Sequence, residues 1–246
     1  MKTVITHFYN EEYLLPWWLE HHKKYFDHGI LIDYHSTDNS VNVCKEICPT
    51  WEIVTSRNSD FQANTIDDEV LSLEKNLDDW RIALNVTEFL VGDLDRLMYS
   101  NGAKHRYLIP SITFYDWNPN GELKRDLPLW EQKTTGIHYK DNFMARRARS
   151  LHNYFIVRYP VGRHFEKFDC EDALVFHYAN CISSPEMVQR RLQIQTRIPA
   201  ADIARGLGHQ HHNFGKGLTL SSLKTFYEKE LDKLKDYQDI IIKYTK

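Results

Sequence analysis

Three short polar segments each follow a run of β-branched and aromatic residues that predicts a buried strand. These segments are Asn10-Glu11-Glu12, the stretch from Asp33 to Asp38, and Asn85-Val86-Thr87-Glu88. In an open α/β sheet, ligands bind beyond the carboxyl ends of the parallel strands. We therefore expect the three segments to share one ligand site. Helix caps and turns would explain the first two segments if each were taken alone.

Strands and helices along the first half of the chain must position these segments. Short strand patterns alternate there with helical patterns, which predicts a mostly parallel sheet flanked by helices. Asn10 is a good helix N-cap, and the helix after it should run to about residue 26. Ile66, Val70, Leu73 and Leu77 have helical spacing and predict an amphipathic helix. The predicted strands are 2–8, 29–34, 51–55 and 81–84, and the further helices are 40–47 and 64–80.

The second half of the chain has a different pattern. Shorter and partly antiparallel strands are expected there, at 107–115, 135–139, 154–159 and 173–178. Ser184, Pro185 and the residues around them form a capping-box pattern that predicts a helix to about residue 198. A final helix is expected over 221–245. Residues 1–182 should form one α/β domain, and 183–246 should form helices packed on the same domain.

Composition narrows the classes of function. The 246-residue chain has a net charge of −3 and no separate block of Lys and Arg, which argues against nucleic acid as a partner. The short apolar start and the lack of an 18-residue apolar run predict a cytoplasmic protein with no membrane span. Four cysteines in a chain of this length argue against a disulfide scaffold, and Cys44 and Cys48 should pack on one helix face.

Three segments carry a resemblance to a known family. THFYNEEYLLPWWLEHH (6–22), GILIDYHSTDNS (29–40) and WRIALNVTEFL (80–90) resemble glycosyltransferase family 2-like and family 92-like proteins. The first segment resembles their N-E-x motif and W-L-x-H-H helix end, and the second their S-T-D-x-S turn. The third resembles their W-x-x-x-x-D-x-D-E-F-L segment. The similarity covers residues 1 to 100 and continues loosely through 146–164 and 176–178.

The resemblance implies a GT-A (Rossmann-like) mixed sheet flanked by helices, with a C-terminal helical segment. It also implies inverting transfer of a sugar from a nucleotide-sugar donor, a UDP- or GDP-sugar, to a glycan or other hydroxyl acceptor. The residues expected around the donor are Phe8, Asn10, Glu11, Asp33, Ser36, Asp38, Asn85, Thr87, Arg146 and Arg149.

The D-x-D motif of such proteins holds Mn²⁺ or Mg²⁺ against the donor diphosphate. Its two carboxylate positions are Asn85 and Thr87 in this sequence. Three alternatives follow. Glu88 could bind the metal, the nearby Asp93-Leu94-Asp95 could do so, or arginine and lysine side chains could hold the diphosphate without a metal. The positively charged side chains that could hold the diphosphate are those of Lys140, Arg146, Arg147 and Arg149. His177 matches a late metal ligand of the resembled proteins, and a hydrogen-bonded core histidine explains it equally well.

Inverting transfer also requires a general base that accepts the proton of the acceptor hydroxyl. The candidates are Asp116, which lies among aromatic residues suited to stacking on sugar rings, and the pair Glu171 and Asp172. Asp116 is slightly preferred.

Two rival functions remain. One is a non-catalytic nucleotide- or carbohydrate-binding protein with a degenerate donor site. The other is a nucleotidyltransferase, which the lack of a Gly-rich phosphate loop after the first strand disfavours.

Overall fold

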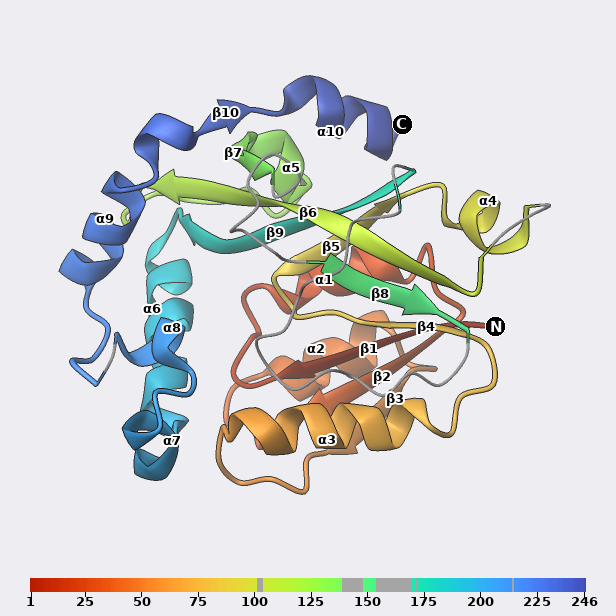
Figure 1. Ribbon diagram of the computed structural model, residues 1–246, viewed down its shortest axis with the longest axis horizontal. Helices are drawn as coiled ribbons and strands as arrows, with labels where there is room; N and C mark the ends of the chain where they lie inside the picture. Colours follow the sequence, from red (N-terminus) through yellow and green to blue (C-terminus); the bar gives the residue numbers. More distant parts are fainter. Residues whose placement is uncertain (101–103, 139–147, 154–169, 171, 214) are drawn as a thin grey trace.

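The computed structural model describes residues 1–100, 104–138, 148–153, 170, 172–213 and 215–246. These residues form an α/β fold around a ten-stranded mixed sheet flanked by helices (Figure 1). The predicted fold class, including the C-terminal helical segment, is therefore confirmed. Within the described part of the chain, no helix has both the length and the hydropathy needed to cross a membrane.

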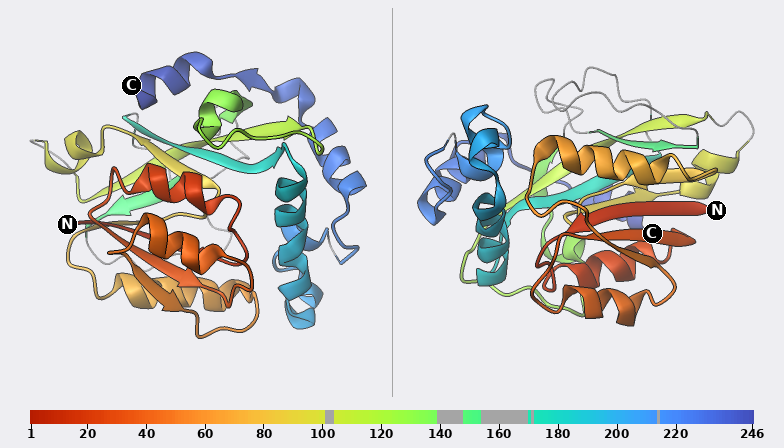
Figure 2. Two further views of the ribbon diagram at one scale, coloured as in Figure 1. Left: turned by 180° about the vertical axis from the view of Figure 1, so that it is seen from behind. Right: turned by 90° about the horizontal axis from the view of Figure 1, so that it is seen from below.

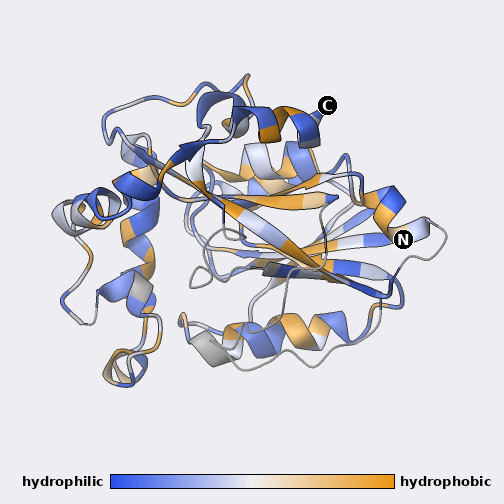
Figure 3. Ribbon diagram, turned by 45° about the horizontal axis from the view of Figure 1, so that its top comes forward, coloured by the Kyte–Doolittle hydropathy of each residue, from blue (hydrophilic) through white to orange (hydrophobic). Residues whose placement is uncertain are grey.

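One half of the sheet is parallel, and its bounds lie close to those expected. Its strands are β1 (Lys2–Phe8), β2 (His28–Asp33), β3 (Glu52–Thr55) and β4 (Trp80–Ala83). Helices α1 (Leu15–His22) and α2 (Ser40–Ile47) cover one face, and α3 (Ala63–Glu74) covers the other (Figure 2). Successive residues of a strand point to opposite faces, so each strand supplies both cores. Val4 packs on the α1 side, whereas Ile5 packs with Ile66 and Val70 of α3. Figure 3 shows the corresponding hydrophobic stripe on α3.

The order of the parallel strands is β4-β1-β2-β3. The chain therefore adds strands on one side of β1 and then crosses to the other side to form β4. This reversal is the topological switch point of a doubly wound sheet, where the loops after two neighbouring strands diverge and leave a crevice. The loops concerned are those after Phe8 and Ala83.

The other half of the sheet is mostly antiparallel. Its strands are β5 (Glu88–Gly92), β6 (Arg106–Trp117), β7 (Thr135–His138), β8 (Ala148–His152), β9 (Ala173–Ile182) and β10 (Lys235–Asp236). β6 and β9 are parallel to each other, and β8 joins this half to β4. The short helices α4 (Leu94–Tyr99) and α5 (Leu129–Gln132) lie in the connections. The strand expected at 154–159 lies outside the described residues.

The C-terminal segment begins as expected, because the Ser184 side chain accepts a hydrogen bond from the Met187 backbone N–H and caps α6 (Pro185–Gln193). A 3₁₀ turn, η1 (Ile194–Arg197), then ends the predicted helix. The remaining elements are α7 (Ala200–Ala204), α8 (His209–His212), α9 (Leu220–Glu228), η2 (Leu231–Lys233) and α10 (Gln238–Thr245).

Three helix predictions were wrong. The helix expected over 64–80 ends at Glu74. The single helix expected over 221–245 is broken, because Lys235 and Asp236 pair with the edge strand β7 and the buried Tyr237 hydroxyl accepts the His138 backbone N–H. This pairing overrides the local helical pattern. The first helix begins at Leu15 instead of after Asn10, because Asn10 has a left-handed backbone with φ of 50°.

Candidate functional site

The loops after β1 and β2 are joined by hydrogen bonds around Asn10. Its side-chain Oδ1 accepts the Thr37 backbone N–H at 2.7 Å, and its own backbone N–H donates to Ser36 Oγ at 3.0 Å. Asp33 Oδ1 accepts the Ser36 backbone N–H at 2.9 Å. Asparagine tolerates a left-handed backbone better than most residues. The backbone of the turn and the hydrogen bonds of the side chain therefore both favour asparagine at position 10. The structure therefore brings Asn10, Asp33 and Ser36 together.

Glu11 and Asp38 fasten the same two loops to α2. The Glu11 backbone N–H donates to Ser40 Oγ at 2.8 Å, and the Asp38 carboxylate accepts the backbone N–H groups of Glu12 and Ser40. The Glu11 carboxylate is buried and accepts a hydrogen bond from Nε of Arg190 at 2.7 Å. Burial raises the pKa of Glu11, and the adjacent Arg190 guanidinium opposes this rise.

Helix α6 and the η1 turn cover this end of the sheet with three side chains that the sequence analysis missed. Arg190 pairs with Glu11, and Gln193 Nε2 donates to the backbone carbonyls of Tyr9 and Asn10, both at 3.0 Å. The Arg197 guanidinium lies 4.1 Å from the centroid of the Tyr9 ring and donates to the Tyr34 carbonyl at 2.7 Å. Steps of three and four residues place the three on one helical face, a signal that was present in the sequence.

A buried carboxylate fixes the loop after β3. Glu69 of α3 accepts hydrogen bonds from the Tyr34 hydroxyl, Ser56 Oγ, the Arg57 backbone N–H and Asn58 Nδ2, at 2.7 to 3.0 Å. Burial alone would raise the pKa of Glu69, but these hydrogen bonds outweigh it and the pKa is lowered. An ionised carboxylate therefore holds the loop that follows β3.

On the other side of the switch point, Glu88 forms a two-pronged ion pair with Arg149 of β8. Arg149 Nε and one terminal nitrogen each lie 2.7 Å from a different Glu88 oxygen, and the Asn85 backbone N–H donates to Glu88 Oε2 at 2.8 Å. Glu88 is 2% exposed. Burial by itself lowers the pKa of Arg149, but the Glu88 carboxylate outweighs this effect and raises it. The pair is a fixed charge centre directly after Asn85 and Thr87.

His177 lies beside this pair. It is directly opposite Glu88 in the antiparallel β5–β9 register, and opposite side chains stand on the same face of a sheet. Its Nδ1 lies 3.0 Å from Thr113 Oγ of β6, and the ring is buried. We call Glu88, Arg149, His177 and Thr113 the Glu88 cluster. The structure thus brings together two predicted metal ligands and one predicted donor-binding arginine.

The described residues do not fit a metal site. Among them, no three His, Cys, Asp or Glu side chains are grouped so that they could hold an ion. Both Glu88 oxygens already bind Arg149. Asp93 caps α4 by accepting the Arg96 backbone N–H, and Asp95 pairs with Lys2 at 2.8 Å. Lys2 starts β1, so Asp95 lies at the amino end of the parallel strands, away from the switch point.

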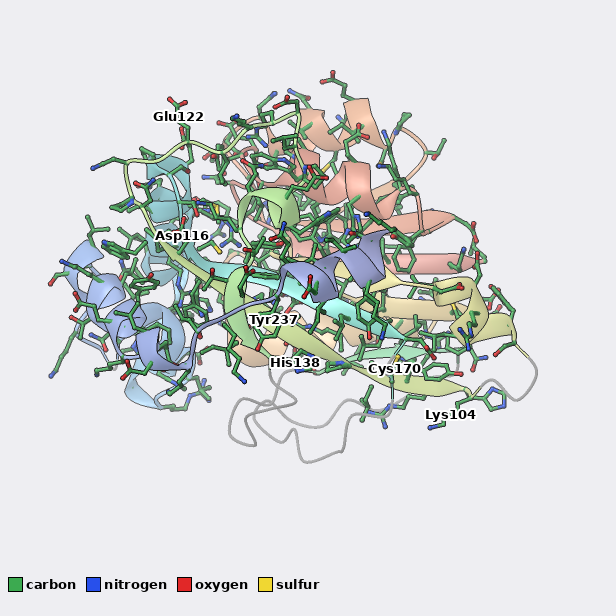
Figure 4. All side chains as sticks on the ribbon, turned by 90° about the horizontal axis from the view of Figure 1, so that it is seen from above. Lys104, Asp116, Glu122, His138, Cys170 and Tyr237 are labelled. Atoms are coloured by element: carbon green, nitrogen blue, oxygen red, sulfur yellow. The ribbon has the colours of Figure 1, made fainter. Side chains whose placement is uncertain are left out.

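The candidate bases lie at opposite ends of β9. Asp116 pairs with Cys181 in the β6–β9 register, whereas Asp172 is exposed and directly precedes the first residue of β9. Nine residues of strand separate the two levels by roughly 30 Å. The Asp116 carboxylate contacts Lys133 Nζ and accepts the Ser183 hydroxyl at 2.9 Å. Figure 4 shows Asp116 near the end of β6 that faces the C-terminal helices.

The remaining predicted site residues divide into two groups. Phe8 is buried in the core on the α1 side, and Thr87 is buried with its carbonyl accepting the Tyr178 backbone N–H. Both act through packing and backbone contacts. Lys140, Arg146, Arg147 and Glu171 lie outside the described residues.

Neither a protein-family model nor a curated protein matches this sequence. Partial similarity is found to solved structures. Staphylococcus aureus TarS 1–349 in complex with UDP-GlcNAc is 15% identical over 50% of this chain and 37% of that chain, with a TM-score of 0.33. Glucosyl-3-phosphoglycerate synthase from Mycobacterium tuberculosis, in complex with phosphoglyceric acid, is 12% identical over 62% of this chain and 57% of that chain, with a TM-score of 0.36. Another structure of TarS 1–349 is 12% identical over 80% of this chain and 65% of that chain, with a TM-score of 0.38. This chain spans less than two thirds of each of the three.

Proposed function

We propose that the protein is an inverting glycosyltransferase of the GT-A type that uses a nucleotide-sugar donor, a UDP- or GDP-sugar. The observation that carries this proposal is the switch point between β1 and β4, whose two loops carry the part-exposed Asn10 on one side and the part-exposed Asn85 on the other, with Glu11 and Thr87 buried beside them. Nucleotide ligands bind at this position of open α/β sheets. The sequence resemblance independently assigns the same loops to the donor.

In the proposed complex, the nucleoside part of the donor lies by Asp33, Asn10 and Ser36, whose loops are rigidly joined. The diphosphate faces the Glu88 cluster. Glu88 binds one edge of the Arg149 guanidinium and balances its charge, and the guanidinium retains further N–H donors for phosphate oxygens. These fixed donors would stabilise the negative charge that develops on the departing diphosphate. This arrangement requires no metal, in agreement with the neutral Asn85 and Thr87.

Asp116 is the proposed base. It lies three residues along β6 from Thr113 of the Glu88 cluster, about 10 Å of strand, and this odd spacing places its side chain on the opposite face of β6 from Thr113. Lys133 and Ser183 hold its carboxylate in one orientation. A glycan hydroxyl that reaches this carboxylate beyond the end of β6 would lose its proton to it as it attacks the anomeric carbon. Displacement in one step inverts the configuration of that carbon.

The test is a thermal-shift screen with UDP, GDP, CDP and dTDP and their common sugars, each with and without Mn²⁺. We expect one nucleotide to raise the melting temperature equally in both conditions. A shift that requires Mn²⁺ would contradict the cationic arrangement. The absence of any shift would contradict the donor site itself.

Asp33→Ala should reduce the affinity for the selected nucleotide at least about tenfold, or roughly 1.4 kcal/mol. Asp27→Ala is the matched control, because Asp27 accepts the Lys2 backbone N–H at the opposite end of β1. Calorimetry should show weaker nucleotide binding for Asp33→Ala alone, with both variants folded. Unchanged affinity of Asp33→Ala would remove Asp33 from the donor site.

A second candidate function is a nucleotide- or carbohydrate-binding protein without transferase activity. It is favoured by the replacement of both D-x-D carboxylates and by the complete occupation of Glu88 by Arg149. Nucleotide-sugar binding with neither donor hydrolysis nor transfer to added saccharides would select this function over the first.

A further inference from the structure

Strand β5, which carries Glu88, has one strand beside it in the described part of the chain, β9. In an antiparallel pair, alternate residues direct their backbone groups to the partner strand, and the residues between them direct theirs away from it. The Thr87 carbonyl accepts the Tyr178 backbone N–H of β9, so the backbone groups of Glu88 and Leu90 point to the other edge. Both residues are at most 2% exposed. The Glu88 backbone N–H donates to the Asn85 carbonyl, and the other three groups need partners elsewhere in the protein.

Helix α1 supplies these partners with three side chains. Trp18 Nε1 donates to the Glu88 carbonyl at 2.9 Å. His21 Nε2 donates to the Leu90 carbonyl at 2.7 Å, and His22 Nε2 accepts the Leu90 backbone N–H at 3.2 Å. Steps of three and four residues place the three side chains on one face of α1. Helix α1 therefore gives β5 the hydrogen bonds that a neighbouring strand would give.

The surroundings of the two histidines fix which ring nitrogen donates and which accepts. His22 Nδ1 lies 2.9 Å from the Trp18 carbonyl, which can only accept, so Nδ1 carries the proton and Nε2 is the acceptor. Burial lowers the pKa of both histidines, to about 4 for His21, so both rings are neutral. A charged His22 ring would have no lone pair for the Leu90 backbone N–H. Each ring therefore suits one particular backbone group of β5.

The strand held in this way carries one half of the Glu88–Arg149 pair. The Glu88 carboxylate binds Nε and a terminal nitrogen of Arg149, while the carbonyl of the same residue is held by Trp18. Two parallel N–H···O bonds require one relative position of guanidinium and carboxylate. A shift of β5 against α1 would therefore turn the Arg149 guanidinium or break one of its bonds.

We propose that Trp18, His21 and His22 are positioning residues of the donor site, an inference that rests on the proposed function. They hold β5 so that Glu88 directs the remaining N–H groups of Arg149 toward the donor diphosphate. They act through the β5 backbone and not by touching the donor. The loops after β1 and β2, where we place the nucleoside, are fastened by hydrogen bonds of their own. Loss of the bonds to β5 should therefore weaken recognition of the diphosphate more than that of the rest of the nucleotide.

The experiment compares His22→Leu, which removes the acceptor for the Leu90 backbone N–H, with His22→Gln, whose side-chain oxygen can replace it. The first measurement is the ¹⁵N–¹H NMR signal of the Arg149 Nε–H group in the full chain without nucleotide. We expect His22→Leu to shift or broaden this signal and His22→Gln to leave it near its wild-type position. Leu19→Ala is the matched control, because Leu19 is as buried in α1 as His22 but has no hydrogen-bonding side chain.

The second measurement is the calorimetric affinity for UDP and UMP and for GDP and GMP. For the base that binds, the ratio of diphosphate to monophosphate affinity should fall at least about fivefold in His22→Leu. It should stay within about twofold of the wild-type ratio in His22→Gln and Leu19→Ala. A smaller folded fraction lowers both apparent affinities by one factor and leaves the ratio unchanged. Trp18→Phe, which removes the donor to the Glu88 carbonyl and keeps an aromatic ring, should behave as His22→Leu does and replaces it if that variant does not fold.

An Arg149 signal that neither His22→Leu nor Trp18→Phe changes would overturn the proposal, and so would an unchanged affinity ratio. Equal changes in Leu19→Ala would also overturn it, because packing alone would then explain them. The nucleotide-free signal separates this inference from the proposed function. The expected Arg149 changes in a protein that binds no nucleotide would contradict the donor site and keep the link from α1 to Arg149. Nucleotide binding with neither change in His22→Leu would do the reverse.

Discussion

Glu88 and Arg149 join β5 to β8 through two hydrogen bonds of 2.7 Å, and the carboxylate is almost fully buried. Such a pair is costly to break from one side, because the charge left behind is desolvated and unpaired. The same pair stands next to Asn85, on the side of the switch point where we place the donor diphosphate. At this residue, stability and the proposed chemistry therefore depend on one contact.

We expect Arg149→Ala to lower the free energy of unfolding by about 3 kcal/mol, because Glu88 remains buried without its partner. The double variant Glu88→Gln/Arg149→Ala should recover a large part of this loss, since no buried charge is left. Urea unfolding measures both. A double variant no more stable than Arg149→Ala would show that Glu88 is not the source of the loss.

His21 and His22 give the fold a dependence on pH. His21 Nε2 donates to the Leu90 carbonyl at 2.7 Å, and His22 Nε2 accepts the Leu90 backbone N–H at 3.2 Å. Burial lowers the pKa of His21 to about 4 and lowers that of His22 as well. Both rings are therefore neutral in the folded protein, whereas the unfolded chain binds protons at an ordinary histidine pKa of about 6.5.

Because protons bind the unfolded chain first, these histidines stabilise the fold fully above pH about 6.5 and lose that contribution as the pH falls toward 4. For His21 alone, the loss is roughly 3 kcal/mol. Urea unfolding at pH 7.5 and pH 5 should show a smaller difference for His21→Gln than for the wild type. His35→Asn, at an exposed position with a left-handed backbone, should keep the wild-type difference.

Helix α6 is the element that closes the strand ends. It begins at the Ser184 cap, and its far end, with η1, carries Gln193 and Arg197 onto the β1 and β2 loops. These contacts fix the loops from outside the sheet.

Loss of the cap should loosen this element. We expect Ser184→Ala to lower the free energy of unfolding by about 1 kcal/mol, and Ser184→Asp to lower it less, because aspartate also caps helices. Thermal and urea unfolding of the two variants measure the difference. Equal losses in both variants would show that burial of the serine, and not its hydrogen bond to Met187, determines the effect.

Across the whole molecule, the C-terminal residues close the antiparallel half of the sheet. β10 pairs with β7, α10 packs against β5, and Tyr237 and Ile241 are part of the main core. This closure lies on the side of the molecule away from α3 (Figure 1). The parallel half and its switch point are built without it.

A chain truncated after Leu234 should therefore lose stability but retain the nucleotide affinity of the full chain. Burial of Tyr237 and Ile241 contributes about 2 kcal/mol each, so we expect a loss of about 4 kcal/mol. Urea unfolding measures the loss, and calorimetry at low temperature measures the affinity. Removal of Thr245 and Lys246 alone is the control and should change neither. Lost affinity in a folded truncated protein would place part of the donor site in this segment.

The sequence by itself determined the local elements and the edge of the sheet at which polar groups gather. Lys2–Phe8 was predicted with its observed bounds, and Ile66 and Val70 pack as their spacing indicated. Strand and helix periodicities are local properties, so short windows of sequence contain them. The convergence of Asn10, Asp33 and Ser36 followed as well, because parallel strands end at one edge.

Only the tertiary structure decided which distant side chains complete that edge. Arg190 reaches Glu11 across 179 residues and Arg149 reaches Glu88 across 61, contacts that no local period encodes. The same holds for Asp95, which lies near Glu88 in sequence but at the other end of the parallel strands, beside Lys2. The pairing of β10 with β7 likewise broke a helix that its own residues favoured. Strand order and edge pairing depend on burial and hydrogen bonding summed over the whole sheet, and these sums are fixed only when the chain is folded.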